Sequence, residues 1–413
     1  MARPDLANAD ARERGAGRAL TLARPFAHTS GRHGGGSAAD VHVVAVEDRR
    51  SAGSFIRVPW PLYASDPAWV PPLLVERRYH LSRRRPYFSH AQARFWVAYR
   101  NGTAVGRISA QIDRLHQERY DDATGFFGLL EAEDDPRTFR ALFTAAESWL
   151  RTEGVRRVRG PFGLSINEES GLLVDGFDTP PMVLMPHGRP YYPARVEEQG
   201  YAGVKDLLAY RLPADFQVPE LIQATLRKAD GVLVVRPLQR RSFRRELATL
   251  RSIFEDAWSD NWGFIPFTEA EFEELGWLLR FIVPDGFVQI AELGGEAVGM
   301  LVLLPNVHEA IRDLDGRLLP LGWLKLVWRL GVRTPRTARV ALMGVRRRCQ
   351  RTALGLAAAV LMVDGVRAAG LAHGLRDVEL SWVLEDNLGM RSLLTAIGSV
   401  PYKRYRIYEK SLA

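Results

Sequence analysis

A basic turn in the second half of the chain combines residue types that suit phosphate binding. The segment VALMGVRRRCQRTALGLAAAVLMVDGV (340–366) predicts a strand, a turn, and an apolar helix that begins near Thr352. A helix N-terminus has unpaired N–H groups and a partial positive charge, so a pyrophosphate can bind there. Small side chains allow close approach, and no acid occupies the first turn. The expected contacts are Val345, Arg346, Gln350, Arg351, Thr352, Ala353, Leu354 and Gly355. The alternative is a surface turn with solvated arginines; a P-loop is excluded because Gly-Lys-Ser/Thr is absent.

A second group of polar residues lies in Gly- and Pro-rich loops of the first half, between 160 and 201. Polar and aromatic side chains in such loops often line a site. Because this half has no phosphate-binding turn, we expect it to shape the pocket for the acceptor substrate. The expected substrate contacts are Asn167, Glu168, Glu169, His187, Tyr191 and Tyr192. The alternative is a set of turns with solvated acids and packing tyrosines. No metal site is predicted, because the histidines show no ligand spacing.

Composition and charge restrict the class of protein. The 413 residues are 46% hydrophobic and 25% charged, which predicts two soluble domains and a tail. With Cys349 as the one cysteine and no apolar run of about 18 residues, we expect a cytoplasmic protein without disulfides or a transmembrane helix. Residues 316–363 hold ten Lys and Arg and no acid, although the whole chain carries only +8. This local field favours a phosphate ligand or an anionic membrane over nucleic acid.

The order of expected elements repeats along the chain. In the first half we expect a strand at 40–48, helices at 55–63 and 73–81, a hairpin at 94–113, a strand at 125–135 and a helix at 137–153. In the second half we expect a strand at 231–237, helices at 243–258 and 269–282, a hairpin at 287–305, a strand at 339–345, a helix at 353–369, a strand at 377–384, a helix at 387–397 and a strand at 402–410. This order predicts a tandem α/β repeat: a disordered leader at 1–39, a domain at 40–213 and a domain at 219–413.

The hexapeptide Gln350–Gly355 resembles motif A of the GNAT superfamily of acyl-CoA N-acyltransferases, with Ala353 in place of the first glycine. The segment ELSWVLEDNLGMRSLLTAIGSVPYKRYRIYEK resembles the ending of the same fold, with Asn387 and Gly398 at the family's Asn and Gly positions. The resemblance covers 236–410, with a fainter echo over 41–212. It implies a tandem GNAT-like α/β fold, with mixed, mostly antiparallel sheets flanked by helices. It also implies acyl-CoA as co-substrate at the basic turn, and no metal.

GNAT transfer is an attack of an amine on a thioester, which needs an acceptor for the amine proton and an oxyanion contact. Glu379 is the first candidate base, on the strand that splays from its neighbour in this fold, and Glu385 is the second. We group Asn387 with these catalytic candidates and Trp382 with the substrate contacts. The position of the usual general-acid tyrosine is Leu394, so that role is not carried over.

The segment LLPLGWLKLVWRLGV (318–332) has the composition of an interfacial helix on an anionic membrane, although a buried helix with two snorkelling cations fits as well. The pieces GPFGLSINEESGLLVDGFDTPPM, PYY and ELSWVLEDN resemble a family of tandem GNAT-like bacterial proteins that includes the bacterial ceramide synthases. Some members are described as dATP pyrophosphohydrolases, but this chain has no Nudix-like Glu-rich box. The resemblance implies transfer of a long-chain acyl group to the amine of a sphingoid base, at the inner face of the membrane. A small amine or peptide acceptor, and a non-catalytic acyl-CoA sensor, remain alternatives; oligomeric state, acyl chain length and the donor's carrier (CoA or acyl carrier protein) stay open.

Overall fold

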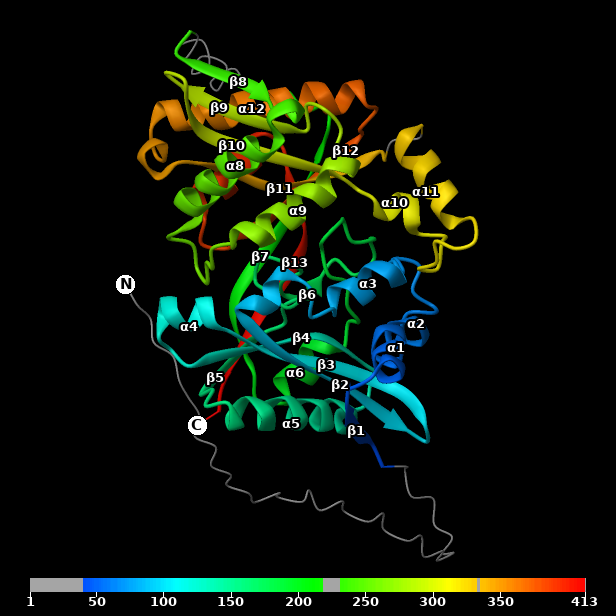
Figure 1. Cartoon of the computed structure of the whole chain (residues 1–413). Helices are drawn as coiled ribbons and strands as arrows, with labels where there is room; N and C mark the ends of the chain where they lie inside the picture. The colour runs from blue at the N-terminus through cyan, green and yellow to red at the C-terminus, as the bar shows by residue number, and fades with distance from the viewer. Residues whose placement is uncertain (1–39, 218–230, 333–334, 413) are drawn as a thin grey trace, which may run out of the picture. The chain divides into compact units, whose positions relative to one another are not determined.

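One mixed sheet runs through the described part of the chain, which in this computed structural model comprises residues 40–217, 231–332 and 335–412. The strands follow the order β1-β2-β3-β4-β5-β13-β7-β12-β11-β10-β9-β8, and β6 pairs with β13 (Figure 1). All neighbouring strands are antiparallel except the pairs β4–β5 and β11–β12, which are parallel. This arrangement confirms the expected mixed, mostly antiparallel sheet.

The two halves repeat one topology. In each half, four successive antiparallel strands lead to a crossover helix and a parallel fifth strand. The first half contains β1 (His42–Ala45), α1 (Arg49–Arg57), α2 (Pro59–Leu62), α3 (Leu74–His80), η1 (Pro86–Ser89), β2 (Ala91–Arg100), β3 (Thr103–Asp113), α4 (Arg114–Tyr120), β4 (Thr124–Ala132), α5 (Pro136–Thr152), β5 (Arg157–Gly160), β6 (Leu172–Asp175), α6 (Tyr192–Glu197) and β7 (Ala202–Pro213).

The second half contains β8 (Leu233–Pro237), η2 (Arg240–Ser242), α8 (Phe243–Trp258), α9 (Glu269–Ile282), β9 (Val288–Leu293), β10 (Glu296–Pro305), α10 (His308–Ile311), α11 (Gly322–Gly331), β11 (Thr337–Val345), η3 (Arg347–Cys349), α12 (Ala353–Ala372), β12 (Asp377–Leu384), α13 (Leu388–Ala396) and β13 (Val400–Ser411). Helices α8 and α9 and strand β12 have the bounds that the sequence predicts. The tandem repeat of element order is therefore confirmed. The domain division at 213–219 stays a prediction, and the expected leader at 1–39 lies outside the described residues.

The last strand of each half pairs with the other half. β13, at the end of the chain, lies between β5 and β7, and β7 in turn pairs with β12. In Figure 1 the red strand β13 therefore lies beside green strands of the first half. Chain order alone assigns β13 to the second half, so the sheet contains an exchange that the sequence does not reveal.

The helices cover both faces of the second half. Neighbouring residues of β11 point to opposite faces: Leu342 lines a cavity under α8 and α9, whereas Met343 lines a cavity under α12 and α13. Helix α12 buries Met362 and Val366 in the core. By length and composition alone α12 could cross a membrane, with 39% of its most apolar 18 residues buried. The sequence predicts no transmembrane helix, because no apolar run reaches about 18 residues; in α12 Asp364 and Arg367 interrupt the run.

The first helix begins earlier than the sequence analysis expected. Helix α1 begins at Arg49 rather than near Phe55, because Asp48 and Ser51 form a capping box. It also ends before Pro59, where a separate short helix begins. The apolar pattern at 55–63 therefore spans two helices.

Candidate active site in the second half

Strands β11 and β12 separate beyond a bulge in β11, and the space between the separated strands is hereafter called the cleft. The pairing of β10 with β11 shifts between Val302 and Leu303, which leaves Ala341 as an extra residue in β11. The ladder between β11 and β12 covers only 337–340 against 377–380, so the two strands separate from Ala341 onward. This is the splay that the GNAT resemblance implies.

The open stretch of β11 presents backbone groups to the cleft. Arg346 N–H donates to the Val298 carbonyl at 2.7 Å, and donors along one edge of a strand alternate. Met343 and Val345 therefore point their backbone groups away from β10, toward the cleft. The Val345 carbonyl accepts a hydrogen bond from Gln350 Nε2 at 3.1 Å. The N–H groups of Met343 and Val345 can donate to a ligand oxygen.

The basic turn lies at the open end of this cleft and faces solvent. Residues 350–354 are exposed, whereas Gly355 is buried. Thr352 caps α12, because its Oγ1 accepts from Gly355 N–H at 3.0 Å. Within the described residues, the N–H groups of Ala353 and Leu354 have no acceptor. These two donors and the helix charge are available to an anion.

Gly355 also has a packing role that its sequence context does not indicate. A Cβ at this position would lie 2.0 Å from the Cys349 carbonyl oxygen. The glycine therefore allows the turn to close against α12, in addition to keeping the surface small.

The arginines of the turn are partly neutralised by acids from other elements. Arg347 N–H donates to Asp256 at 2.7 Å, and its guanidinium lies 3.3 Å from Asp260. Arg348 pairs with Glu296 at 2.5 Å. Arg346 Nε donates to the Ala297 carbonyl at 2.9 Å. The ten Lys and Arg residues of 316–363 are therefore not all unpaired charges in the folded protein.

Some residues of the turn also hold it in place. Gln350 Nε2 donates to the carbonyls of Ala257 and Val345, both at 3.1 Å, and so ties the turn to the end of α8. Arg351 is exposed and adopts a left-handed backbone with φ of 59°. Among the described residues it has no carboxylate partner. Of the arginines in the turn, Arg351 is therefore the one most available to bind a phosphate.

Glu379 lies at the closed end of the cleft in a buried hydrogen-bond network. The carboxylate has no solvent exposure and faces Arg339 on β11, with Nε–Oε1 at 3.7 Å. Ser381 Oγ donates to Glu379 at 2.5 Å and accepts from Arg339 Nε at 2.8 Å. Tyr402 on β13 donates its hydroxyl to the second carboxylate oxygen. Burial raises the pKa of Tyr402, and the charge of Glu379 adds to this effect.

Two buried donors beside this network lack a partner among the described residues. They are the Tyr405 hydroxyl and Trp382 Nε1. The Arg339 guanidinium lies over the Trp382 ring, 4.7 Å from its centroid. Buried donors without acceptors are rare in folded proteins and suit contact with a ligand oxygen.

Lys403 is a further buried cation near Glu379. Its ammonium donates to the carbonyls of Gly176 at 2.9 Å and Thr179 at 2.7 Å. Burial lowers the pKa of Lys403 to about 8, although Glu379 and Asp66 oppose this shift. Lys403 thereby links the charge of Glu379 to the first half of the chain.

The other catalytic candidates lie outside the network. Glu385 accepts from Asp206 N–H at 3.1 Å, and Asn387 caps α13 by accepting from Met390 N–H at 3.1 Å. Leu394 is buried and lines the cavity under α12 and α13, hereafter the α12–α13 cavity. Glu385 and Asn387 therefore have structural partners, and their catalytic roles stay predictions.

The acids of the first half form ion pairs rather than an open pocket. Glu168 pairs with His80 at 2.7 Å and with Arg85 at 2.8 Å. Glu169 pairs with Arg77, and nearby cations lower the pKa of both glutamates against the effect of burial. Asn167 Nδ2 donates to the Ile265 carbonyl at 3.0 Å. The ion pairs lie within the first half, whereas the Asn167 bond joins it to the second half.

The aromatic and histidine candidates of the first half form a separate cluster. His187 pairs with Asp66 at 3.1 Å, and Tyr192 donates to Glu131 at 2.7 Å. Tyr191 donates to the Ala132 carbonyl at 2.7 Å. Burial lowers the pKa of His187, against the pull of Asp66. The structure does not bring these residues into the Glu379 network, and their role as substrate contacts stays a prediction.

Sequence reasoning missed Arg339 and Tyr402, which belong to the Glu379 network, and Lys403 and Tyr405, which lie beside it. Arg339 and Glu379 are 40 positions apart and meet only through the parallel register of β11 and β12. The other three lie on β13, whose insertion into the sheet is not readable from chain order. One signal was available: YKRY places two tyrosines and two cations together in an expected strand.

Comparison with solved structures shows that the fold is that of tandem GNAT proteins. A tandem GNAT protein from the clavulanic acid biosynthesis pathway aligns over 91% of this chain and 99% of its own, with a TM-score of 0.54 and 14% identity. A glucosamine N-acetyltransferase region of a fungal β-N-acetylglucosaminidase aligns over 91% of this chain and 38% of its own, with a TM-score of 0.57 and 14% identity. No family model matches the sequence.

Two relatives define the family. A bacterial ceramide synthase of Caulobacter vibrioides is 46% identical over 378 residues, which is 91% of this chain and 98% of that protein. Protein YghO of Escherichia coli is 46% identical over 360 residues, 87% of this chain and 92% of its own length. The chain therefore belongs to the bacterial ceramide synthase family of tandem GNAT-like proteins, and it is an acyltransferase.

Proposed function

We propose that the protein transfers a long-chain acyl group from acyl-CoA to the amine of a sphingoid base. The observation that carries this proposal is the cleft between β11 and β12. At one end it has free helix N–H groups at Ala353 and Leu354, and at the other the buried carboxylate of Glu379. A pyrophosphate bound at the first end leaves the pantetheine arm to run along the splayed strands, toward the carboxylate.

The reaction then needs only groups already described. The amine nitrogen attacks the thioester carbonyl, a C–N bond forms, and the C–S bond to CoA breaks. The N–H groups of Met343 or Val345 stabilise the developing oxyanion. We assign the amine proton to Glu379, transferred through the Tyr402 hydroxyl, which donates to that carboxylate. The same proton then returns through Tyr402 to the departing thiolate, so that the products are an amide and CoA thiol and Glu379 is again a carboxylate.

The α12–α13 cavity supports a long-chain donor. Its lining is apolar apart from Arg367 and includes Met343 and Leu380, one from each splayed strand. Leu394, at the position of the usual GNAT tyrosine, lies in the same lining. The cavity has a volume of about 50 Å³, so the first carbons of an alkyl chain that leaves the thioester between the strands can be buried here, at roughly 0.8 kcal/mol for each CH₂ group, and a longer chain requires α12 and α13 to move apart.

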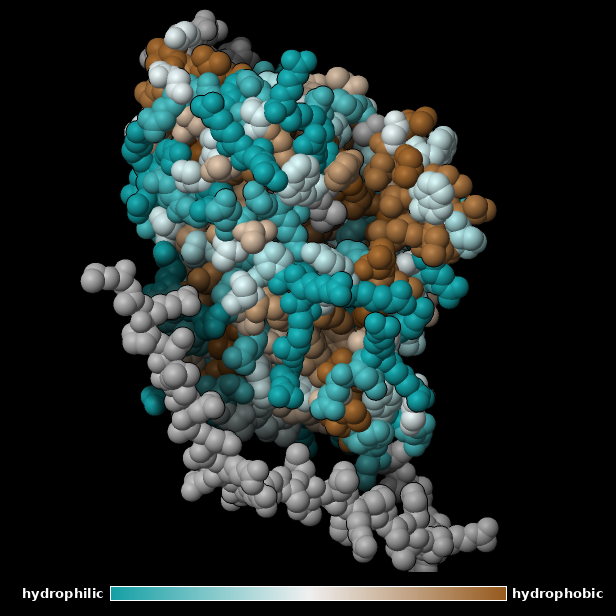
Figure 2. Space-filling model, viewed as in Figure 1, coloured by the Kyte–Doolittle hydropathy of each residue, from teal (hydrophilic) through white to brown (hydrophobic). Residues whose placement is uncertain are grey.

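The surface supports a lipid acceptor. Helix α11 has no buried residue, and it exposes apolar side chains together with those before and after it: Leu319 80%, Leu321 62%, Trp323 47%, Leu324 47%, Val327 63%, Trp328 55% and Val332 71%. The alternative of a buried helix is therefore wrong. Figure 2 shows this apolar surface over α10 and α11. Exposed apolar surface with tryptophans and Lys325 suits peripheral contact with an anionic membrane, where a lipid amine is reached. The name of the Caulobacter relative, a ceramide synthase, points to the same acceptor class. We therefore place the protein in the cytoplasm, peripherally at the inner membrane face.

The test is product formation by the purified protein. Palmitoyl-CoA is supplied with sphinganine, with a small amine, or with a peptide that has a free amino terminus, and the amide products are measured by mass spectrometry. We expect the N-acyl sphinganine amide to dominate, and Tyr402→Phe to lower its rate at least about a hundredfold. Tyr408→Phe is the matched control, because it lies on the same strand but bonds Glu197. Binding of palmitoyl-CoA without formation of any amide would support the alternative of a non-catalytic acyl-CoA sensor. Full activity in Tyr402→Phe would show that the amine proton does not pass through Tyr402.

A further inference from the structure

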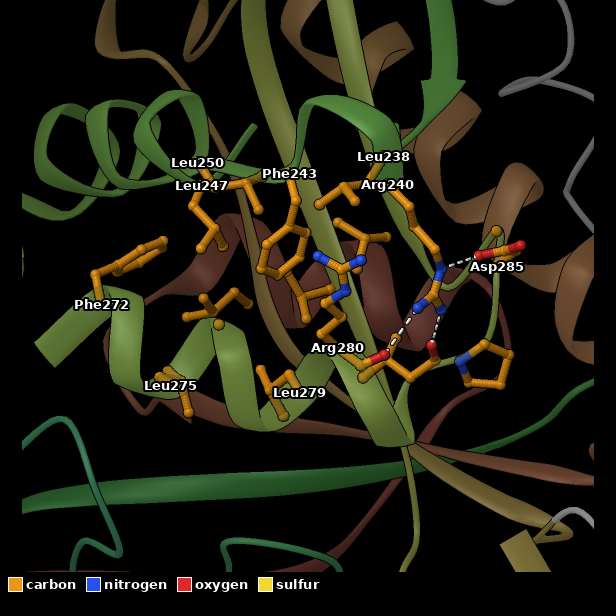
Figure 3. A pocket seen from close by; sticks show the side chains of 17 residues that line it. Leu238, Arg240, Phe243, Leu247, Leu250, Phe272, Leu275, Leu279, Arg280 and Asp285 are labelled. Atoms are coloured by element: carbon orange, nitrogen blue, oxygen red, sulfur yellow. Dashed lines mark hydrogen bonds and ion pairs between the residues drawn. The ribbon is translucent and has the colours of Figure 1, made fainter. Parts of the chain in front are cut away.

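We propose that a second lipid site lies beneath α8 and α9 and binds a single-chain amphiphile with an anionic head. An apolar cavity, hereafter the α8–α9 slot, runs between these two helices and strands β9, β10 and β11 (Figure 3). It is distinct from the α12–α13 cavity, because the two lie on opposite faces of the sheet. Neither the acyl donor nor the amine acceptor of the proposed reaction requires it.

The interior of the slot, with a volume of about 70 Å³, suits the end of a hydrocarbon chain. Figure 3 shows Phe243, Leu247, Leu250, Phe272, Leu275 and Leu279 along its walls. The polar residues of the lining are Arg240, Arg280 and Asp285. Arg240 and Asp285 pair with each other, and Arg240 also donates to the Arg280 and Val283 carbonyls, so it closes the C-terminal end of α9. The remaining walls offer no hydrogen-bonding side chain to a polar ligand.

The mouth of the slot is strongly basic. A surface hollow that shares Arg240, Phe243 and Arg280 with the slot is also lined by Arg241, Arg244 and Arg245. These three side chains are exposed, and within the described residues none of them pairs with a carboxylate. The Arg280 guanidinium lies over the Phe243 and Trp277 rings, at 5.1 and 5.2 Å from their centroids. Within the part of the chain that the structure describes, four cations without a carboxylate partner therefore surround one end of an apolar cavity.

The sign of this charge selects the ligand. A guanidinium matches phosphate or carboxylate oxygens in a bidentate manner, and several together create a field that attracts anions. The same field repels an ammonium, so a cationic sphingoid base is excluded from this entrance. A chain that fills the slot and a head that meets the arginines define one ligand class, whose head is a carboxylate, as in a fatty acid, or a phosphate, as in a monoalkyl phosphate.

The test measures binding of defined probes to the full-length protein by calorimetry, below their micelle concentrations. The probes are dodecyl phosphate, dodecanoate and dodecyltrimethylammonium, and the first two separate a phosphate head from a carboxylate head. We expect both anions to bind and the cation not to bind. Lengthening the bound anion by one CH₂ should tighten binding about fourfold until the slot is full.

Two variants and a control locate the site. The triple change Arg241→Glu, Arg244→Glu and Arg245→Glu should weaken anion binding at least tenfold. The control changes Arg78, Arg83 and Arg84 to Glu, which alters net charge equally at exposed arginines of the first half. Leu279→Trp should fill the slot and remove the chain-length dependence, with folding verified by a thermal melt.

Four results would overturn the proposal: equal binding of the cationic probe, equal losses in the two triple variants, no dependence on chain length, or displacement of dodecyl phosphate by CoA. The last result would assign the anion to the acyl donor's own site. Because no acyl donor or amine is present in the assay, an inactive enzyme would not affect the outcome.

Discussion

Replacing Glu379 by Gln should separate the contribution of this carboxylate to catalysis from its contribution to folding. Arg339 has 2% of its surface exposed and would lose its carboxylate partner while keeping bonds to Ser381 and the Val183 carbonyl. Burial already lowers the pKa of Arg339, and the Glu379 charge opposes this. Removing one partner of a buried ion pair costs about 3–5 kcal/mol, because the remaining charge is uncompensated. If Glu379 also accepts the amine proton, the rate should fall by about 10²–10⁴.

A second variant distinguishes the two effects. The double change Glu379→Gln and Arg339→Met removes both charges from the same space, so most of the lost stability should return. Activity should not return, since the proton acceptor is still missing. Urea unfolding gives the free energy, and amide formation at saturating acyl-CoA gives the rate.

Either of two results would refute this reasoning. A single variant as stable as the native protein would show that Arg339 does not depend on the carboxylate. A double variant with native activity would show that Glu379 takes no part in proton transfer.

Three further predictions concern other parts of the molecule. Ala353→Glu should stabilise α12 by about 0.3–1 kcal/mol through the helix dipole, as measured by thermal melting. The same change should weaken acyl-CoA binding at least about tenfold, as measured by calorimetry. The control Ala368→Glu, later on the same helix, should have neither effect. Hydrogen bonds to Asp113 and Glu271 raise the pKa of His90 to about 9 against the effect of burial. The folded state therefore binds the proton more tightly than the unfolded state. About 3 kcal/mol of stability, fully present below pH 6.5, should be lost as pH rises through 9. If the unfolding free energy of His90→Gln, measured with denaturant, falls with pH as steeply as that of the native protein, this prediction is contradicted. Leu394→Trp should narrow the α12–α13 cavity and lower the free energy of unfolding by about 1–3 kcal/mol. It should also shift the donor preference from palmitoyl-CoA to shorter acyl chains in competition assays. An unchanged preference would show that the acyl chain binds elsewhere.

Local patterns in the sequence were sufficient for most elements and for the cofactor turn. The apolar spacing at 243–258 and 269–282 predicts α8 and α9 to the residue, because each buries one stripe on the sheet. The expected start of the helix near Thr352 is confirmed, since Thr352 caps it. The start of α1 is readable as well, because Asp48 and Ser51 have capping-box spacing, although the apolar pattern at 55–63 favours a later start.

The network around Glu379 could not be read in the same way. Arg339 appears in sequence as one member of a basic run, yet in the sheet it is buried opposite Glu379. Its identity as an ion-pair partner depends on strand register, which no local periodicity encodes. Tyr402 and Lys403 reach the site only because β13 crosses between the halves. Long-range pairing, rather than local propensity, determines this part of the site.

The exchange of terminal strands also limits how such a protein can change over generations. In a simple duplicated gene, a copy that no longer performs chemistry can shrink or vanish. Here, loss of the first copy would remove β7 from beside β12, and loss of the chain's final segment would open the first copy between β5 and β7. The strand pairing therefore requires the first copy whether or not it takes part in chemistry, and fission of the gene between the copies would yield two products that each need the other to close their sheets.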